Sequence, residues 1–196
     1  MTDPRLVLLR TPGLDLDRWD GVAARMPGFA RTVTIDLPAL AGADVVPRLA
    51  EHVAGELAGL RVRLPHVVGH SLGTAVALEL ACRVPVAAVT SFCAVGFAEP
   101  GRRFFPVIRM RDRYARRYTF PRPERLAGTP VTLVWAERDR VVPPADAGRA
   151  RAALPHAGHI VMPGCGHLVH RDDQNGTAAV VNACHIALLR DDRRAI

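Results

Sequence analysis

Short apolar runs alternate along this chain with segments in which apolar residues recur every three or four positions. An uninterrupted apolar run of about five residues predicts a buried strand, and the wider spacing predicts an amphipathic helix. The pattern predicts strands over residues 5–9, 32–36, 66–69, 86–93, 131–135 and 159–162, and helices over residues 16–26, 44–60, 72–82, 145–154 and 177–189.

Strands and helices therefore follow one another along the chain. Such alternation produces parallel strands joined by crossover helices. We expect an α/β fold, a three-layer sandwich in which helices cover both faces of a mostly parallel central sheet. The length suits one domain spanning residues 1–196. A basic, proline-containing stretch at residues 96–128 interrupts the alternation and is predicted to be an insertion between two strands.

The positive charge is concentrated in that insertion. All 26 basic residues of the chain are arginines. Residues 96–128 hold nine of them and three acidic residues, so this stretch carries +6 of the net charge of +7. Such a patch favours an anionic partner, and an acidic carrier protein or a coenzyme A ester would fit. A solvent-exposed helix face without a partner is the alternative interpretation. Nucleic acid is not expected as a partner, because no nucleic-acid-binding motif accompanies the charge.

Hydropathy and cysteine spacing exclude further classes. No apolar run reaches the about 18 residues of a membrane-spanning helix, and the first residues lack a signal sequence, so we expect a cytoplasmic protein with no membrane partner. The four cysteines show neither a Cys-x-x-Cys pair nor zinc-type spacing, so no metal and no other cofactor are expected. Cys82 and Cys184 lie among alanines and valines and are predicted to be small buried residues.

One motif points to chemistry. Gly-His-Ser-Leu-Gly lies between a predicted strand and a predicted helix, the context that a Gly-x-Ser-x-Gly nucleophile elbow requires. A sharp turn there would project the Ser71 hydroxyl above the sheet edge as a nucleophile. Gly69 and Gly73 are expected to remove side chains that would clash in the turn. The Leu72 amide would lie at the helix N-terminus and face a developing oxyanion.

A nucleophilic serine needs a base, and a histidine base needs an acid that fixes its tautomer. His167 follows the last predicted strand, at the sheet edge where α/β active sites gather, and is preferred as base over His170. Asp139 follows the preceding strand and is preferred as acid over Glu137. His70 is expected to shape the turn rather than act as base. The other histidines are interpreted as surface or helix-face residues: His52, His66, His156, His159 and His185.

The chain order Ser71, Asp139, His167 completes a set of motifs that resembles the α/β-hydrolase superfamily. The resemblance extends from residue 5 to about residue 190. It implies that these three residues form a catalytic triad and that residues 96–128 form a short lid, as in a near-capless member. The matching segments are Leu-Val-Leu-Leu at 6–9, Ile-Asp-Leu-Pro at 35–38, the Gly-His-Ser-Leu-Gly motif, Trp-Ala-Glu-Arg-Asp-Arg-Val-Val-Pro at 135–143 and Gly-Cys-Gly-His at 164–167.

The chain departs from the family pattern after the first strand. Members usually carry His-Gly there, and the next residue donates a backbone N–H to the oxyanion. Arg10 and Thr11 replace that pair, and Pro12, at the simplest register, has no N–H to donate. Loss of one oxyanion donor costs about 3 kcal/mol of transition-state stabilisation. Gly13 or Leu14 would donate if the register shifts, the Thr11 hydroxyl is another candidate, and Arg10 would add a positive charge.

The resemblance implies a serine hydrolase that cleaves a carboxylic ester or thioester through an acyl-enzyme on Ser71. The unusual first loop leaves two alternatives open. One is a lyase or cyclase of specialised metabolism that uses the triad for acid–base catalysis. The other is a non-catalytic binding module. For the hydrolase and for the lyase or cyclase, the expected substrate is a small ester, thioester or related carbonyl compound.

Overall fold

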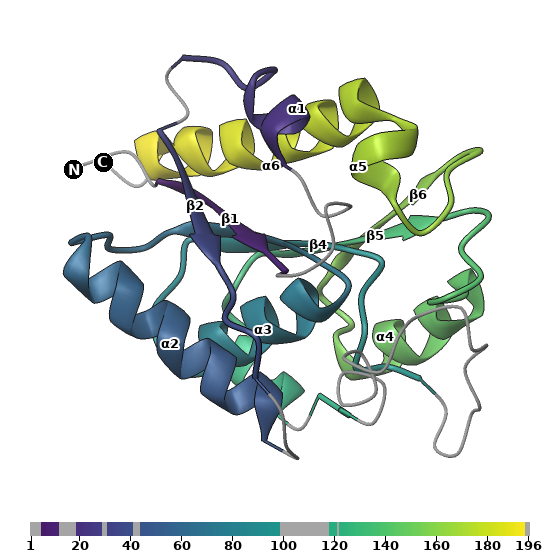
Figure 1. Cartoon of the computed structure of the whole chain (residues 1–196), viewed down its shortest axis with the longest axis horizontal. Coiled ribbons are helices and arrows are strands. Elements are labelled where there is room, and N and C mark those ends of the chain that lie inside the picture. Colours follow the sequence, from purple (N-terminus) through teal and green to yellow (C-terminus); the bar gives the residue numbers. More distant parts are fainter. Residues whose placement is uncertain are drawn as a thin grey trace.

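A six-stranded parallel sheet runs through the centre of the computed structural model (Figure 1). Its strands lie in the order β2-β1-β3-β4-β5-β6, and each neighbouring pair is parallel. They are β1 (Leu6–Arg10), β2 (Thr32–Asp36), β3 (His66–His70), β4 (Ala88–Phe92), β5 (Val131–Ala136) and β6 (Gly158–Met162). The structure describes residues 5–11, 19–28, 31–40, 44–98, 118–120 and 122–194, with side chains up to residue 190.

Helices cover both faces of this sheet, which confirms the predicted three-layer α/β sandwich. Figure 1 shows α2, α3 and α4 on one face and α1 and α6 on the other. The helices are α1 (Asp20–Ala23), α2 (Val45–Gly59), α3 (Leu72–Ala81), α4 (Ala147–Ala153), α5 (Val169–Asp172) and α6 (Gln174–Arg194), with short 3-10 helices η2 (Pro123–Leu126) and η3 (Pro144–Asp146).

The central strands are buried along their whole length because helices cover both of their faces. Every residue of β3 and β4 is buried, as is typical of parallel strands with near-continuous apolar sequence. Strand order reverses between β1, which pairs with β2 on one side, and β3 on its other side. Ligands of open parallel sheets bind at the carboxyl ends of strands near such a reversal.

Several predicted elements differ in length from the observed ones. Within the described residues, the helix expected at 16–26 covers only Asp20–Ala23. The last helix begins at Gln174, three residues early, because Asp173 accepts the N–H of Gly176 in the manner of an N-cap. The single-turn helices α5, η2 and η3 were not predicted, because one turn is too short to show a hydrophobic period.

Two histidines interpreted as surface or helix-face residues are fully buried. His66 Nδ1 lies 3.3 Å from His185 Nδ1, and His66 Nε2 lies 2.8 Å from the Thr90 hydroxyl. Burial and the neighbouring His185 lower the pKa of His66 to about 3, so it is neutral in the folded chain. Cys82 is buried as expected, whereas Cys184 is only half-buried.

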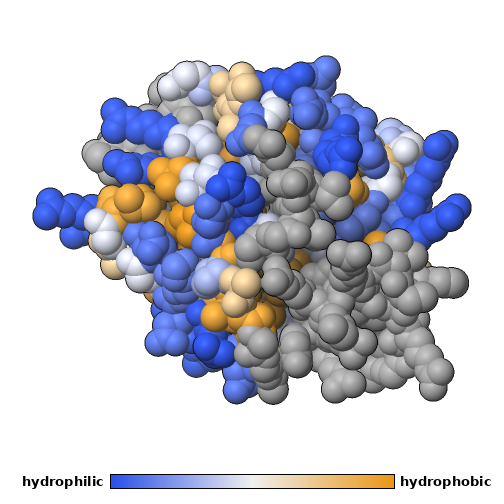
Figure 2. All heavy atoms as spheres, viewed as in Figure 1, coloured by the Kyte–Doolittle hydropathy of each residue, from blue (hydrophilic) through white to orange (hydrophobic). Residues whose placement is uncertain are grey.

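The described surface is mainly hydrophilic in the view of Figure 2, with smaller hydrophobic patches. No described helix combines the length and apolar character needed to cross a membrane. The greater part of the basic insertion, residues 99–117 and 121, lies outside the described residues. The lid therefore stays a prediction.

Candidate active site

Ser71 is the single residue between β3 and α3. Its backbone has φ 50° and ψ −115°, and a positive φ is costly for a residue with a Cβ atom. Its N–H donates to the Phe92 carbonyl at 3.0 Å. Its carbonyl accepts the Thr74 N–H at 3.0 Å and the Thr74 hydroxyl at 2.6 Å. These bonds hold a strained turn that places Ser71 at the carboxyl end of β3.

The two motif glycines have different surroundings. A Cβ atom on Gly69 would lie within 2.3 to 2.8 Å of the backbone of Gly73 and Thr74, so only glycine fits there. A Cβ atom on Gly73 would lie 3.6 Å from Leu9, which is ordinary van der Waals contact. The predicted clash is therefore correct for Gly69 and wrong for Gly73.

His167 lies between Ser71 and Asp139. Its Nε2 is 3.1 Å from Ser71 Oγ, and its Nδ1 is 2.8 Å from Asp139 Oδ2. The other carboxylate oxygen of Asp139 accepts the N–H groups of Val141 at 2.7 Å and Val142 at 2.8 Å. Burial raises the pKa of Asp139, but these hydrogen bonds outweigh it, so the pKa lies below its usual value. An ionised carboxylate thus faces His167.

The loop between β6 and α5 carries His167 and is fixed on both sides. The Gly164 N–H donates to Glu137 Oε2 at 2.7 Å, and the Gly166 N–H donates to Asp172 Oδ2 at 2.7 Å. Glu137, the rival acid of the sequence analysis, is exposed and contacts this loop. Its position supports the loop backbone rather than the His167 ring.

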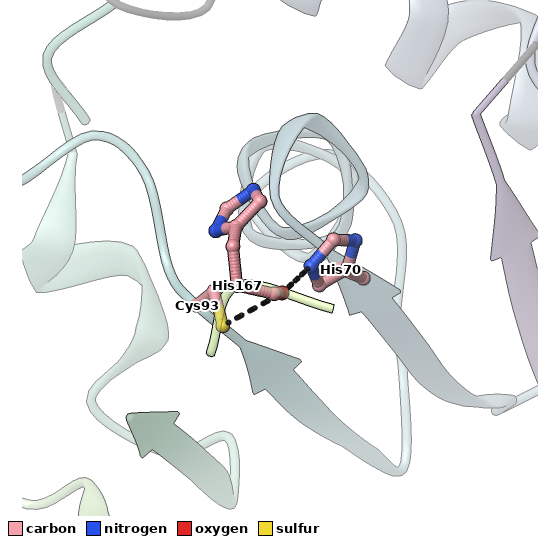
Figure 3. Close-up of side chains that lie close together, drawn as sticks. All are labelled: His70, Cys93 and His167. Atoms are coloured by element: carbon pink, nitrogen blue, oxygen red, sulfur yellow. Dashed lines mark hydrogen bonds between the residues drawn. The ribbon is translucent and has the colours of Figure 1, made fainter. Parts of the chain in front are cut away.

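Two further side chains form hydrogen bonds with the backbone of His167. His70 Nε2 lies 2.6 Å from the His167 carbonyl oxygen, and Cys93 Sγ lies 3.4 Å from the same atom (Figure 3). Nitrogen and sulfur atoms of the three residues lie within 4.8 Å of one another, a grouping that could attract a soft metal ion. A metal there would have to displace hydrogen bonds that already use these groups.

His170, the rival base, lies deeper than His167. It is fully buried in α5, and its ring contacts those of His70 and Trp19, with centroids 4.8 Å and 5.2 Å away. The geometry therefore favours His167 over His170 as the partner of Ser71. His70, expected to shape the turn, lies between the two histidine rings.

Arg10 ends β1 beside the site, and its guanidinium is turned toward the neighbouring strand end. It forms a two-bonded ion pair with Asp36 at the end of β2, in which Nη2 lies 2.6 Å from Oδ2. The hydrogen bond from Arg10 lowers the pKa of Asp36. The positive charge near the site is thus balanced by a carboxylate.

The expected oxyanion donors are only partly within the described residues. Leu72 is the first residue of α3, where N–H groups point out of the helix. Thr11 follows β1 and is half-buried. Pro12, Gly13 and Leu14 lie outside the described residues, so which of them faces Ser71 stays a prediction.

A buried carboxylate anchors the described end of the basic insertion to α3. Glu79 is buried and accepts the Tyr118 hydroxyl at 2.9 Å and Arg122 Nη2 at 2.5 Å. Arg83, one helical turn away, also donates to it. Burial raises the pKa of Glu79, but these donors outweigh burial and the pKa lies below its usual value. The other end is held by Arg149, which donates to the Phe97 carbonyl at 2.8 Å.

Sequence reasoning missed three residues of the site. Thr74 and Cys93 contact the backbone of Ser71 and His167, and Glu79 contacts the insertion. A threonine three residues after the serine was a usable signal, because its hydroxyl can reach the carbonyl of residue i−3. The roles of Cys93 and Glu79 depend on distant segments and gave no local signal.

Comparisons with known proteins agree with this architecture. A model of the alpha/beta hydrolase family matches residues 6–128. No curated protein sequence gives a significant match. Solved structures cover nearly all of the chain, at identities low enough that they show the shared fold alone.

Three of these structures illustrate the range. One is a membrane phospholipase A described as a bacterial virulence factor, with 21% identity, 95% of this chain and 79% of that chain covered, and a TM-score of 0.77. Another is the 2-hydroxy-6-oxo-6-phenylhexa-2,4-dienoate hydrolase of Rhodococcus sp. strain RHA1, with 16% identity, coverages of 94% and 91%, and a TM-score of 0.73. A thermophilic esterase from Thermogutta terrifontis has 15% identity, coverages of 95% and 92%, and a TM-score of 0.70.

Proposed function

The chain belongs to the alpha/beta hydrolase family, and on that basis we propose that it is a serine hydrolase that cleaves a carboxylic ester or thioester through an acyl-enzyme on Ser71. The observation that carries the proposal is the continuous line of contacts from the Ser71 hydroxyl through His167 to the Asp139 carboxylate. Among the structural neighbours, a phospholipase A and an esterase are named for ester substrates, which is consistent with it.

The first half-reaction forms the acyl-enzyme. The Nδ1–H group of His167 donates a hydrogen bond to the Asp139 carboxylate, which leaves the unprotonated Nε2 free to take the proton of Ser71 Oγ. Ser71 Oγ bonds to the acyl carbon, and the carbonyl oxygen becomes an oxyanion that the Leu72 N–H stabilises. The C–O or C–S bond to the leaving group then breaks, and His167 gives its proton to the departing alcohol or thiol.

The second half-reaction repeats these steps with water. His167 Nε2 takes a proton from water, whose oxygen bonds to the acyl carbon, and then returns the proton to Ser71 as the acid leaves. A second oxyanion donor would come from residues 11–14. With Pro12 there, Thr11, Gly13 or Leu14 is the candidate.

The charge pattern supports a preference for an acyl group on an anionic carrier, an acidic protein or coenzyme A. Seven arginines of residues 96–128 lie between the two anchored ends of the insertion in sequence. If the proposal is correct, the triple change R113E/R116E/R117E will slow turnover of coenzyme A thioesters and leave turnover of neutral nitrophenyl esters unchanged. If the variant turned over coenzyme A thioesters as fast as the wild type does, this preference would be contradicted.

The proposed chemistry is tested by intact-protein mass after treatment with a fluorophosphonate probe. We expect one adduct on the wild type and none on S71A. In a separate assay, the unlabelled wild type should hydrolyse short acyl esters or thioesters. Absence of an adduct on folded protein would contradict acyl-enzyme chemistry. It would favour instead the lyase or cyclase alternative, which the unusual Arg10-Thr11-Pro12 sequence of the first loop left open.

A further inference from the structure

We infer that His70 and Cys93 form a two-donor clamp on the main-chain carbonyl of His167, and that His70 is a positioning residue for the proposed base. The inference rests on the proposed function, since it concerns the histidine that this function uses. It assigns His70 a role beyond shaping the turn around Ser71. It also gives Cys93 a role that no sequence motif indicated.

Hydrogen-bond chemistry fixes the state of both donors. A carbonyl oxygen only accepts, so His70 Nε2 must carry a proton to make its contact of 2.6 Å. For the same reason Cys93 must be a thiol to make its contact of 3.4 Å. Burial raises the pKa of Cys93 well above its usual value, and the Asp139 carboxylate raises it further through its charge and a hydrogen bond with the thiol. The thiol stays protonated, and its one proton is shared between this carboxylate and the His167 carbonyl.

The two donors come from neighbouring strands in the middle of the sheet. His70 is the last residue of β3, and Cys93 directly follows β4, which pairs His70 with Phe92. The His167 loop comes from the far side, after the edge strand β6. The clamp therefore ties a loop at the edge of the sheet to the two strands beside Ser71.

The orientation of His167 explains why this tie controls the ring. In Figure 3 the His70 and Cys93 side chains point at the His167 carbonyl, and the His167 ring points away from both. The carbonyl and the side chain are attached to one another through the Cα atom. A held carbonyl limits movement of the His167 Cα atom and its Cα–Cβ bond, and the hydrogen bond to Asp139 sets the ring torsions. Together they place Nε2 3.1 Å from Ser71 Oγ.

Packing holds the His70 ring in its donating position. Its ring lies between those of His167 and His170, with both centroids 4.8 Å away, and its exposed fraction is 3%. A buried hydrogen bond meets little competition from water. The Cys93 thiol is fully buried but is the weaker donor, so His70 is expected to contribute more of the effect.

A pair of substitutions separates donation from packing. H70Q places an amide N–H near the position of Nε2, whereas H70N places one near Nδ1 and cannot reach the carbonyl. We expect H70N to lower kcat by about 10- to 100-fold with KM changed little, because displacement of a catalytic group by about 1 Å has that effect. H70Q should stay within a few-fold of wild type. C93A should lower kcat less than H70N does.

The test needs readouts besides activity. The proton shared by His167 and Asp139 should give a strongly deshielded 1H NMR signal, present in wild type and H70Q and lost or shifted in H70N. Urea unfolding establishes that each variant is folded, and H156N, a change at an exposed histidine, controls for loss of an imidazole. The pH profile of kcat/KM should shift in its acid limb for H70N alone.

Two results would overturn the clamp. One is an H70N enzyme with wild-type kcat and an unchanged NMR signal. The other is equal loss in folded H70N and H70Q, which would mean that the imidazole packs rather than donates. Failure of the proposed function has a different signature, because full ester turnover by S71A would refute the acyl-enzyme while the NMR signal still reports on the clamp.

Discussion

A β-carbon on Gly69 would lie 2.3 Å from the carbonyl oxygen of Gly73, closer than any non-bonded contact allows. The end of β3 and the first turn of α3 thus meet backbone against backbone at this point. Neither backbone can give way without moving Ser71, whose N–H and carbonyl are bonded to Phe92 and Thr74. The strained turn depends on the absence of a single side chain.

The first prediction concerns these two glycines. G69A should destabilise the fold by about 3 kcal/mol or more, because the methyl group must push backbone atoms apart. G73A should be tolerated, because its methyl group would make ordinary contacts with Leu9 and alanine is the better helix former. Urea unfolding measures both variants. Equal stabilities would mean that the turn relaxes around the added carbon.

The second prediction concerns the acid. In D139N the amide oxygen is expected to keep the two backbone N–H donors of Val141 and Val142, so the NH2 group will face His167 Nδ1. Nδ1 must then accept, and Nε2 carries the proton and cannot act as base. We expect kcat to fall about 10⁴-fold while the fold persists, measured with the ester on which wild type is most active.

Glu137 supplies the matched control for that prediction. It is exposed and accepts the Gly164 N–H, a bond that glutamine can also accept. E137Q should therefore keep kcat within a few-fold of wild type. If E137Q were the inactive variant and D139N retained activity, the assignment of the acid would be reversed.

Much of this arrangement was predictable from the sequence because parallel strands end at one edge of a sheet. Segments after three such strands carry Ser71, Asp139 and His167, so their proximity follows from topology. The contact of Cys93 with the His167 carbonyl was not predictable, because it joins residues 74 positions apart through a turn with φ 53°. The buried pair His66 and His185 is separated by 119 positions, and helix periodicity alone does not show which face is covered.

The third prediction concerns the anchor of the basic insertion. E79Q removes the charge that balances Arg83 and Arg122, whose side chains are about one-third exposed and can regain some hydration. We expect a loss of about 2 kcal/mol in the free energy of unfolding. Y118F removes one hydrogen bond to the same carboxylate and should cost about 1 kcal/mol.

A double-mutant cycle is the decisive form of this measurement. If both side chains act through one anchor, the loss in E79Q/Y118F will be smaller than the sum of the two single losses. Strict additivity would show that Tyr118 and Glu79 contribute separately. If both single variants unfolded with the same urea midpoint as the wild type, the anchor would be contradicted altogether.

The fourth prediction concerns stability at acidic pH. The pKa of His66 is about 3 in the folded chain and 6.5 in its ordinary state, so the unfolded chain binds a proton that the folded chain excludes. Protonation of His66 in the unfolded chain does not reduce the free energy of unfolding above about pH 6.5, and it reduces this free energy steadily as the pH falls from 6.5 toward 3. The expected loss is about 1.4 kcal/mol per pH unit, or about 2 to 3 kcal/mol between pH 7 and 4.5.

The choice of pH window isolates this histidine from the carboxylates. Asp139 and Glu79 also have lowered pKa values, but their contributions are lost as the pH falls through the ordinary values of 3.8 and 4.5, where the unfolded chain binds their protons, so only the acidic end of the window reaches them. H66Q cannot ionise, and its amide can still bond the Thr90 hydroxyl, so its free energy of unfolding should change much less over the window. His159, whose pKa is also lowered but which is only half-buried, remains in this variant and sets the residual slope. An equal slope for H66Q and wild type in urea unfolding at pH 7, 6, 5 and 4.5 would show that other groups cause the loss.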